Sequence, residues 1–138
     1  MEQVLTSLGG LINFAIYFSL SLVSLVLFKL IYTFITPHDE WKLVREDKNI
    51  AAAIGLVGAI MGFALALASA ASHSVSIIDF IIWAIIALIA QTIAFGFVRF
   101  VLMPSLIERI NNNEIAAGIV LGGISIAVGI LNAACMTY

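Results

Sequence analysis

Few side chains in this sequence could carry out chemistry, and they are scattered. His38 lies beside acidic residues in the segment Thr36–Trp41, where an imidazole could bind a metal ion, carry a proton or simply be solvated. Cys135 is the lone cysteine, so an intrachain disulfide is impossible, and the thiol is either inert or pairs between subunits. The sequence has no HExxH motif, no phosphate-binding loop and no paired His/Cys metal spacing. These residues predict neither an enzyme nor a bound cofactor or metal.

A second group of polar side chains stands inside long apolar runs: Gln91, Asn132, Lys29 and Arg99. Gln91 lies near the middle of its run, where an amide needs a partner. It predicts either an interhelical hydrogen bond, worth about 1 kcal/mol, or a role in a pore or substrate site. Lys29 and Arg99 lie near the ends of their runs, where long side chains can reach the lipid headgroups, or form a gate or an ion pair. The four residues make up a candidate intramembrane polar site.

The overall composition indicates what surrounds these residues. Of 138 residues, 63% are hydrophobic, and only six are basic and eight acidic. A soluble globule of this size needs more polar surface than 14 charged side chains provide. Binding to nucleic acid needs a basic stripe that six cations do not form. The composition therefore argues against a soluble enzyme and a nucleic-acid binder, and it favours an integral membrane protein.

The apolar residues divide into four runs, which we place at 10–35, 50–72, 76–103 and 115–137. Each exceeds the roughly 20 residues that a helix needs to cross a bilayer core. Helices are expected because lipid cannot satisfy an open sheet edge. We therefore predict an all-α integral membrane protein, with four transmembrane helices in a single domain over residues 1–138.

The charges sort to one side of this arrangement. Four spans place two charged loops, 36–49 and 104–114, on the same side of the membrane, and every Lys and Arg lies in these loops or in the spans just before them. The positive-inside rule makes that side cytoplasmic and places both termini outside, in the periplasm. The first span is not a cleavable signal peptide, because it has no positive leading region and is too long.

The first loop holds the candidate contact residues for a cytoplasmic protein: His38, Glu40, Trp41 and Arg45. Trp41 and Val44 are three residues apart among charges, which predicts a short interfacial helix. Each loop begins at a proline, Pro37 or Pro104, which we expect to end or kink the helix before it.

The two halves of the chain repeat each other. NFAIYF at Asn13–Phe18 parallels DFIIWA at Asp79–Ala84, and ITP at 35–37 parallels LMP at 102–104. NIAAAIGLVGAI at Asn49–Ile60 parallels EIAAGIVLGGIS at Glu114–Ser125, and the offset stays at 65–67 residues throughout. Each copy, 10–72 and 76–137, has two spans, so the copies share one orientation and are related by an axis along the membrane normal. They are either a duplicated stable hairpin or the walls of a pseudo-symmetric pathway.

Small residues recur at helical spacing in the second span of each copy: Gly55, Gly58 and Gly62, and Gly118, Gly122 and Gly129. Small-xxx-small spacing lets helix backbones approach closely in a membrane. We expect these glycines to pack the two spans against each other within the bundle, or to join subunits. A homo-oligomer is expected, with a dimer favoured.

Three segments resemble a known family. ITPHDEW at Ile35–Trp41, NIAAAI at Asn49–Ile54 and NAACMTY at Asn132–Tyr138 resemble the YjfL-like family of bacterial inner-membrane proteins, also described as domain of unknown function 350. The resemblance covers nearly the whole chain and implies a duplicated two-span unit in the bacterial inner membrane. Many members have a glycine or asparagine before the asparagine of the second segment, where this chain has Lys48. The resemblance also implies neighbouring genes, which in this family often encode phage-shock-like membrane-stress proteins or polyamine-related ligases.

Two functions from different classes follow. The first is a non-enzymatic, homo-oligomeric membrane component whose cytoplasmic loops bind a partner and that is linked to membrane stress. The second is a channel or transporter for an ion or small solute, with a pathway near Gln91 and Asn132.

Overall fold

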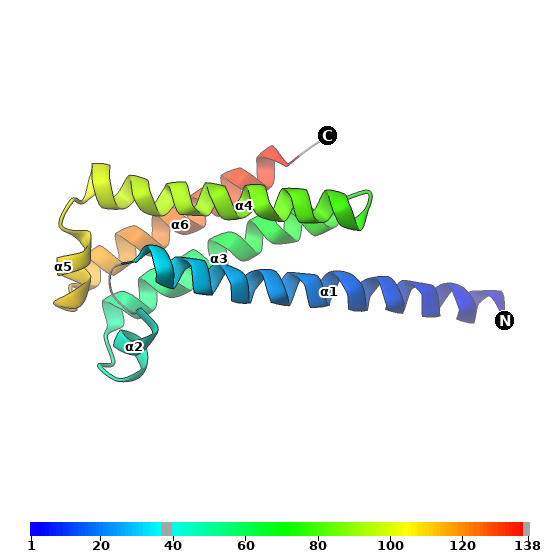
Figure 1. The fold of residues 1–138 in the computed structure, drawn as a ribbon, viewed down its shortest axis with the longest axis horizontal. Helices are drawn as coiled ribbons and strands as arrows, with labels where there is room; N and C mark the ends of the chain where they lie inside the picture. The colour runs from blue at the N-terminus through cyan, green and yellow to red at the C-terminus, as the bar shows by residue number, and fades with distance from the viewer. Residues whose placement is uncertain (37–39, 137–138) are drawn as a thin grey trace.

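The computed structural model describes residues 1–36 and 40–136, and within them the chain is helical and contains no strand. The elements in order are α1 (Glu2–Ile35), α2 (Glu40–Arg45), α3 (Ile50–His73), α4 (Ile77–Phe97), the π-helical turn η1 (Val98–Leu102), α5 (Leu106–Asn111) and α6 (Ile115–Cys135). The short helices α2 and α5 lie at the same end of the bundle (Figure 1), which we call the loop end.

Four helices are long and apolar enough to cross a membrane: α1, α3, α4 together with η1, and α6. The prediction of four helical spans is confirmed. The largest difference is in α1, which begins at Glu2 instead of residue 10 and has 34 residues. At 1.5 Å per residue α1 is about 51 Å long, against about 36 Å for the 24 residues of α3. Its amino-terminal part therefore projects past the α3–α4 turn (Figure 1).

Side chains at the helix starts stop the apolar runs from merging. Asn49 caps α3, where its Oδ1 accepts a hydrogen bond from the Ala52 N–H at 2.8 Å. Ser76 caps α4 by accepting from the Asp79 N–H, and the Asp79 carboxylate accepts from the Val75 N–H. These caps satisfy N–H groups that have no partner within their helix, and the bonds of Ser76 and Asp79 define the turn between α3 and α4.

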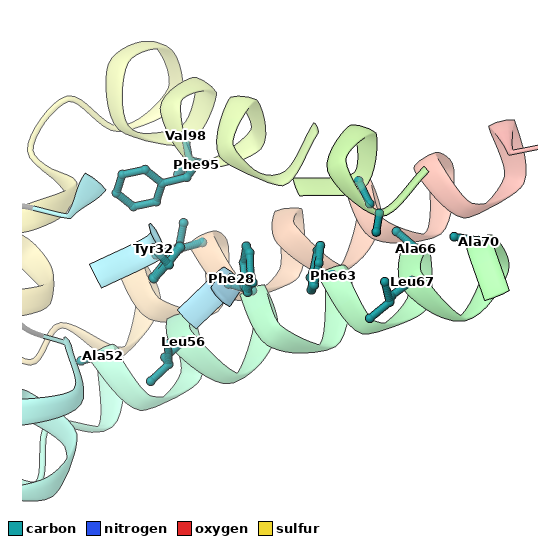
Figure 2. Packing of buried hydrophobic residues seen from close by; sticks show 14 of the residues in the cluster. Phe28, Tyr32, Ala52, Leu56, Phe63, Ala66, Leu67, Ala70, Phe95 and Val98 are labelled. Carbon is teal, nitrogen blue, oxygen red and sulfur yellow. The ribbon is translucent and has the colours of Figure 1, made fainter. Parts of the chain in front are cut away.

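The core is built from aromatic rings of α1, α3 and α4 and from small residues of α3. Phe28 of α1 stacks on Phe63 of α3 with ring centroids 4.6 Å apart, and Tyr32 meets Phe95 of α4 edge to face. Figure 2 shows these rings between the helices, with Ala66 further along α3. The rings fill the space between α1, α3 and α4, whereas α3 and α6 meet mainly through glycine backbone, with the Leu121 side chain against Gly55.

The loop end is more ordered than the sequence predicts. The short helix predicted around Trp41 and Val44 is present as α2, whereas α5 was not expected. Helix α4 ends in the π-helical turn η1, in which the Met103 N–H donates to the carbonyl of Val98 five residues earlier. Pro104 follows directly, so this run ends before the proline as expected. Pro37 lies outside the described residues.

Candidate functional site at the helix seam and the loop end

Helices α3 and α6 touch backbone to backbone along a line of glycines, which we call the seam. A Cβ atom added to Gly58 would overlap the backbone of Gly122, and one added to Gly129 would overlap Gly62. One added to Gly122 would lie 2.7 Å from the carbonyl oxygen of Ile54. Each of the six glycines singled out in the sequence lies in the seam: Gly55, Gly58, Gly62, Gly118, Gly122 and Gly129. Only glycine permits this approach, because a side chain would separate the helices.

Gln91 closes the seam from the side of α4. Its side chain is 3% exposed, and its Nε2 donates to the carbonyl of Ser125 on α6 at 3.3 Å. A Cβ atom on Gly62 of α3 would lie only 2.6 Å from the same nitrogen. The amide is therefore held where three helices meet, among glycine backbone and apolar side chains. It forms an interhelical hydrogen bond between α4 and α6.

The structure does not bring Asn132 to the same place. It follows Ser125 by seven residues along α6, about 10 Å further along the helix axis. Its Nδ2 atom is buried and has no hydrogen-bond partner within the described part of the chain. The two amides predicted as one site are thus separate: one is bonded in the seam, and the other is unsatisfied near the far end of α6.

The two cations predicted inside the spans lie near the loop end, on different elements. The Lys29 Nζ lies 5.7 Å from the centroid of the Trp41 ring, so a cation–π contact joins α1 to α2. The Arg99 guanidinium lies over the Phe100 ring at 5.0 Å, within η1. Both side chains are half-buried. This arrangement fits long cations that reach the headgroup region while their stems cover apolar surface.

One proposed contact residue of the first loop is placed differently from the expectation. Glu40 is 1% exposed, and it interacts with the phenol of Tyr32 on α1. The start of α2 folds onto α1 and α3, so this carboxylate points into the protein and is not presented to a docking partner. Trp41 and Arg45 are exposed as expected. His38 lies outside the described residues.

The two loops are tied together by Asn49, which the sequence analysis did not single out as a site. Besides capping α3, its Nδ2 donates to the carbonyl of Ile110 at the end of α5, at 2.7 Å. Its own N–H donates to the carbonyl of Leu43 in α2. Asn113 adds a second link, accepting from the Ala51 N–H at 3.1 Å. An asparagine directly before an apolar run was the available signal, since this residue type favours helix starts.

The repeat also appears in the backbone of these loops. Lys48 and Asn113 have positive φ angles of 50° and 56°, and they are the non-glycine residues with positive φ in the described chain. They are 65 residues apart, which is the offset of the repeat at this point. Each stands directly before the N-cap residue of the next long helix. At Lys48 the left-handed turn forms without a glycine.

The remaining reactive groups form no cluster. No group of three His, Cys, Asp or Glu side chains that could hold a metal ion occurs among residues 1–36 and 40–136. Cys135 is a free, exposed thiol at the end of α6, opposite the loop end.

Comparisons with known proteins identify the family of this chain. The family model described as Domain of Unknown Function (DUF350) matches residues 6–136. The chain belongs to the DUF350 family. The UPF0719 inner membrane protein YjfL of Escherichia coli (strain K12) is 42% identical over 131 residues, which cover 95% of this chain and 98% of that protein. The UPF0719 transmembrane protein YshE of Bacillus subtilis (strain 168) is 26% identical over 90% of this chain and 92% of its own length. No solved structure gives a significant match.

Membership of the DUF350 family confirms the resemblance and agrees with the four apolar helices. The chain is a multi-pass helical protein of the inner membrane. The names of these relatives state a location and no activity, so family membership by itself identifies no function.

Proposed function

We propose that this DUF350 protein is a non-enzymatic, self-associating component of the inner membrane that binds a cytoplasmic protein through its loop end. In this proposal residues 36–49 and 104–114 face the cytoplasm, and both termini lie in the periplasm. The orientation rests on the charges, because every Lys and Arg lies in or next to the two loops.

One observation carries the proposal: the two loops are joined into a single surface. Asn49 is bonded to Ile110, and Asn113 is bonded to Ala51, so loops that are distant in sequence are fixed to the same helix start. Charged side chains from both loops stand exposed around these links: Arg45, Glu46, Asp47 and Lys48, and Glu108, Arg109 and Glu114. A fixed array of both signs of charge suits recognition of a protein with complementary charges.

The partner we propose belongs to the response to membrane stress, because the genes of the resembled family often lie beside those of membrane-stress proteins. The test is cross-linking in living cells followed by purification through a tag. A variant with Lys42, Arg45, Glu46 and Asp47 neutralised should recover at least about tenfold less of any specific partner than the natural chain. Glu2→Gln, at the far end of α1, is the control and should recover the natural amount. If both variants recover equal amounts of the partner, the loop end is not the contact surface.

The second candidate is a channel or transporter with a pathway near Gln91 and Asn132. The observation that favours it is the buried Asn132 Nδ2 atom, which has no partner within the described residues. The seam weighs against it, because Gln91 is enclosed and bonded. Reconstituted liposomes decide between the two. A channel should show a flux that falls in Asn132→Leu, whereas a docking component should show no flux above that of empty liposomes for several ions.

A further inference from the structure

The two helices of the seam meet through faces that the repeat does not pair. The repeat matches Gly58 with Gly123, yet Gly58 meets Gly122 in the seam. The seam residues of α3 are Ala51, Ile54, Gly55, Gly58 and Gly62, and those of α6 are Gly118, Leu121, Gly122, Ser125 and Gly129. By the offset of 65, the α6 set corresponds to positions 53, 56, 57, 60 and 64 of α3. At 3.6 residues per turn these positions lie on the side of α3 about 180° from its seam residues.

This pattern distinguishes two ways of placing the repeats. A two-fold axis between α3 and α6 would bring matching faces of both helices together. Opposite faces meet when one helix is displaced sideways from the other without being turned. The α3 and α6 helices therefore follow each other as neighbours in a row. This arrangement differs from the axis along the membrane normal that the sequence predicted for the two copies, because opposite faces of the repeat meet in the seam.

A groove on the outside of the seam supports the same arrangement independently. It is apolar, it is open, and both helices line it. Three pairs of repeat-equivalent residues line this one groove: Ile54 and Ile119, Gly58 and Gly123, and Met61 and Ile126. A two-fold axis would place the members of each pair on opposite surfaces of the helix pair, whereas a sideways displacement places them on the same surface.

A row has two ends, and here one end is an exposed helix face and the other is partly exposed. The seam face of α3 has an equivalent on α6 made of Ala116, Ile119, Val120, Gly123 and Ala127. Four of these residues are exposed, Val120 is half-buried, and a Cβ atom on Gly123 would meet nothing within 4 Å. The seam face of α6 has an equivalent on α3 made of Ala53, Leu56, Val57, Ile60 and Ala64. Val57 is 54% exposed, Ala53, Ile60 and Ala64 are half-buried, and Leu56 is buried.

We propose that a second copy of this chain continues the row, with its α3 packed against the Ala116/Gly123/Ala127 face of α6. The contact repeats the seam, with Gly123 and the partner's Val57 in the positions of Gly58 and Gly122. This interface rests on the self-association proposed above and specifies its geometry. The contact is head to tail: each copy offers its α6 face to one neighbour and its α3 face to another. Assembly then gives a closed ring if the rotation between copies closes, and an open row if it does not.

Disulfide trapping in membranes tests the geometry. Both chains carry Cys135→Ser, and two differently tagged populations carry either Val57→Cys or Gly123→Cys. We expect a cross-link between the two tags at a yield at least about fivefold above that of Gly123→Cys with Ile93→Cys, an exposed position on α4. A disulfide of Gly123→Cys with itself, or equal yields for both pairs, would overturn the head-to-tail contact.

A bulky side chain supplies the second test. Gly123→Leu enters open space within one chain, so it should leave folding intact while weakening self-association in nanodiscs about tenfold or more. Gly9→Leu is the matched control, because Gly9 also has nothing within 4 Å. If the natural chain is monomeric at every lipid-to-protein ratio, self-association itself fails. If it assembles and Gly123→Leu assembles equally well, only this interface fails, and lipid covers the face.

Discussion

At the scale of single residues, backbone geometry at two positions matters more than reactive chemistry. Lys48 has a positive φ angle, in which the Cβ atom of a non-glycine residue crowds the carbonyl oxygen. Asn113 has the same conformation but belongs to a residue type that tolerates it. The turn before α3 is therefore strained in a way that the turn before α6 is not.

We predict that Lys48→Gly stabilises the protein. Removing the Cβ atom relieves about 1–2 kcal/mol, and the greater freedom of glycine in the unfolded chain offsets part of it, leaving a gain of about 0.5–1 kcal/mol. Equilibrium unfolding in mixed micelles, followed by tryptophan fluorescence, measures the change. Lys48→Ala removes the same charge but keeps the Cβ atom, so it should show no gain. An equal gain for alanine would mean that the charge of Lys48, and not its φ angle, destabilises the turn.

Gly58→Ala tests the contact between α3 and α6. The added methyl group would overlap the backbone of Gly122, and separating the helices should lower the free energy of unfolding by about 1–3 kcal/mol. Gly9→Ala has open space around it, and alanine favours the helix, so this control should be neutral or more stable by up to about 1 kcal/mol. The same micelle assay compares them, and similar values for both variants would contradict a close-packed seam.

At the scale of elements, Asn49 holds together parts that are not neighbours in sequence. Its side chain caps α3 and bonds to the last turn of α5, and its backbone N–H bonds to α2. These bonds hold the loop end in one arrangement although α2 and α5 have only six residues each, too few to be stable alone.

The two functions of the Asn49 side chain can be separated by substitution. Asn49→Ala removes both and should lower the stability by about 1–2 kcal/mol. Asn49→Asp keeps an oxygen for the cap but has no donor for the Ile110 carbonyl, so α3 should remain capped while α5 loosens. Trypsin cleavage after the exposed Arg109 in detergent measures this loosening, and Asn49→Asp should be cleaved faster than the natural chain. If Asn49→Asp resists trypsin as well as the natural chain, the Ile110 bond does not secure α5.

The spans could be predicted because bilayer thickness imposes a simple rule on composition, and α3, α4 with η1, and α6 lie within a few residues of the predicted runs. The π-helical turn and the burial of Glu40 could not be predicted from the sequence. Both depend on which neighbour each residue meets after folding. The role of Gln91 could be predicted only in part. Its position in a run shows that it needs a partner, but only the packing of three helices identifies that partner as the Ser125 carbonyl.

At the scale of the whole molecule, the uneven placement of charge predicts the orientation in the membrane. All six basic residues lie at or near the loop end, and carrying them across the bilayer would be unfavourable. The opposite end carries Glu2, Asp79 and the exposed thiol of Cys135. A lone natural cysteine at the end without Lys or Arg makes this orientation directly measurable.

We predict that a membrane-impermeant maleimide labels Cys135 in intact spheroplasts, because the proposed orientation places the end of α6 in the periplasm. In a Cys135→Ser background, Lys48→Cys should be labelled only after the inner membrane is opened, and Val75→Cys, in the α3–α4 turn, should be labelled before it. Lys48 and Val75 are both exposed, so accessibility within the protein does not distinguish them. The reverse pattern would place the loop end in the periplasm, and because a cytoplasmic protein could not then reach Arg45 or Arg109, it would exclude the docking function as well.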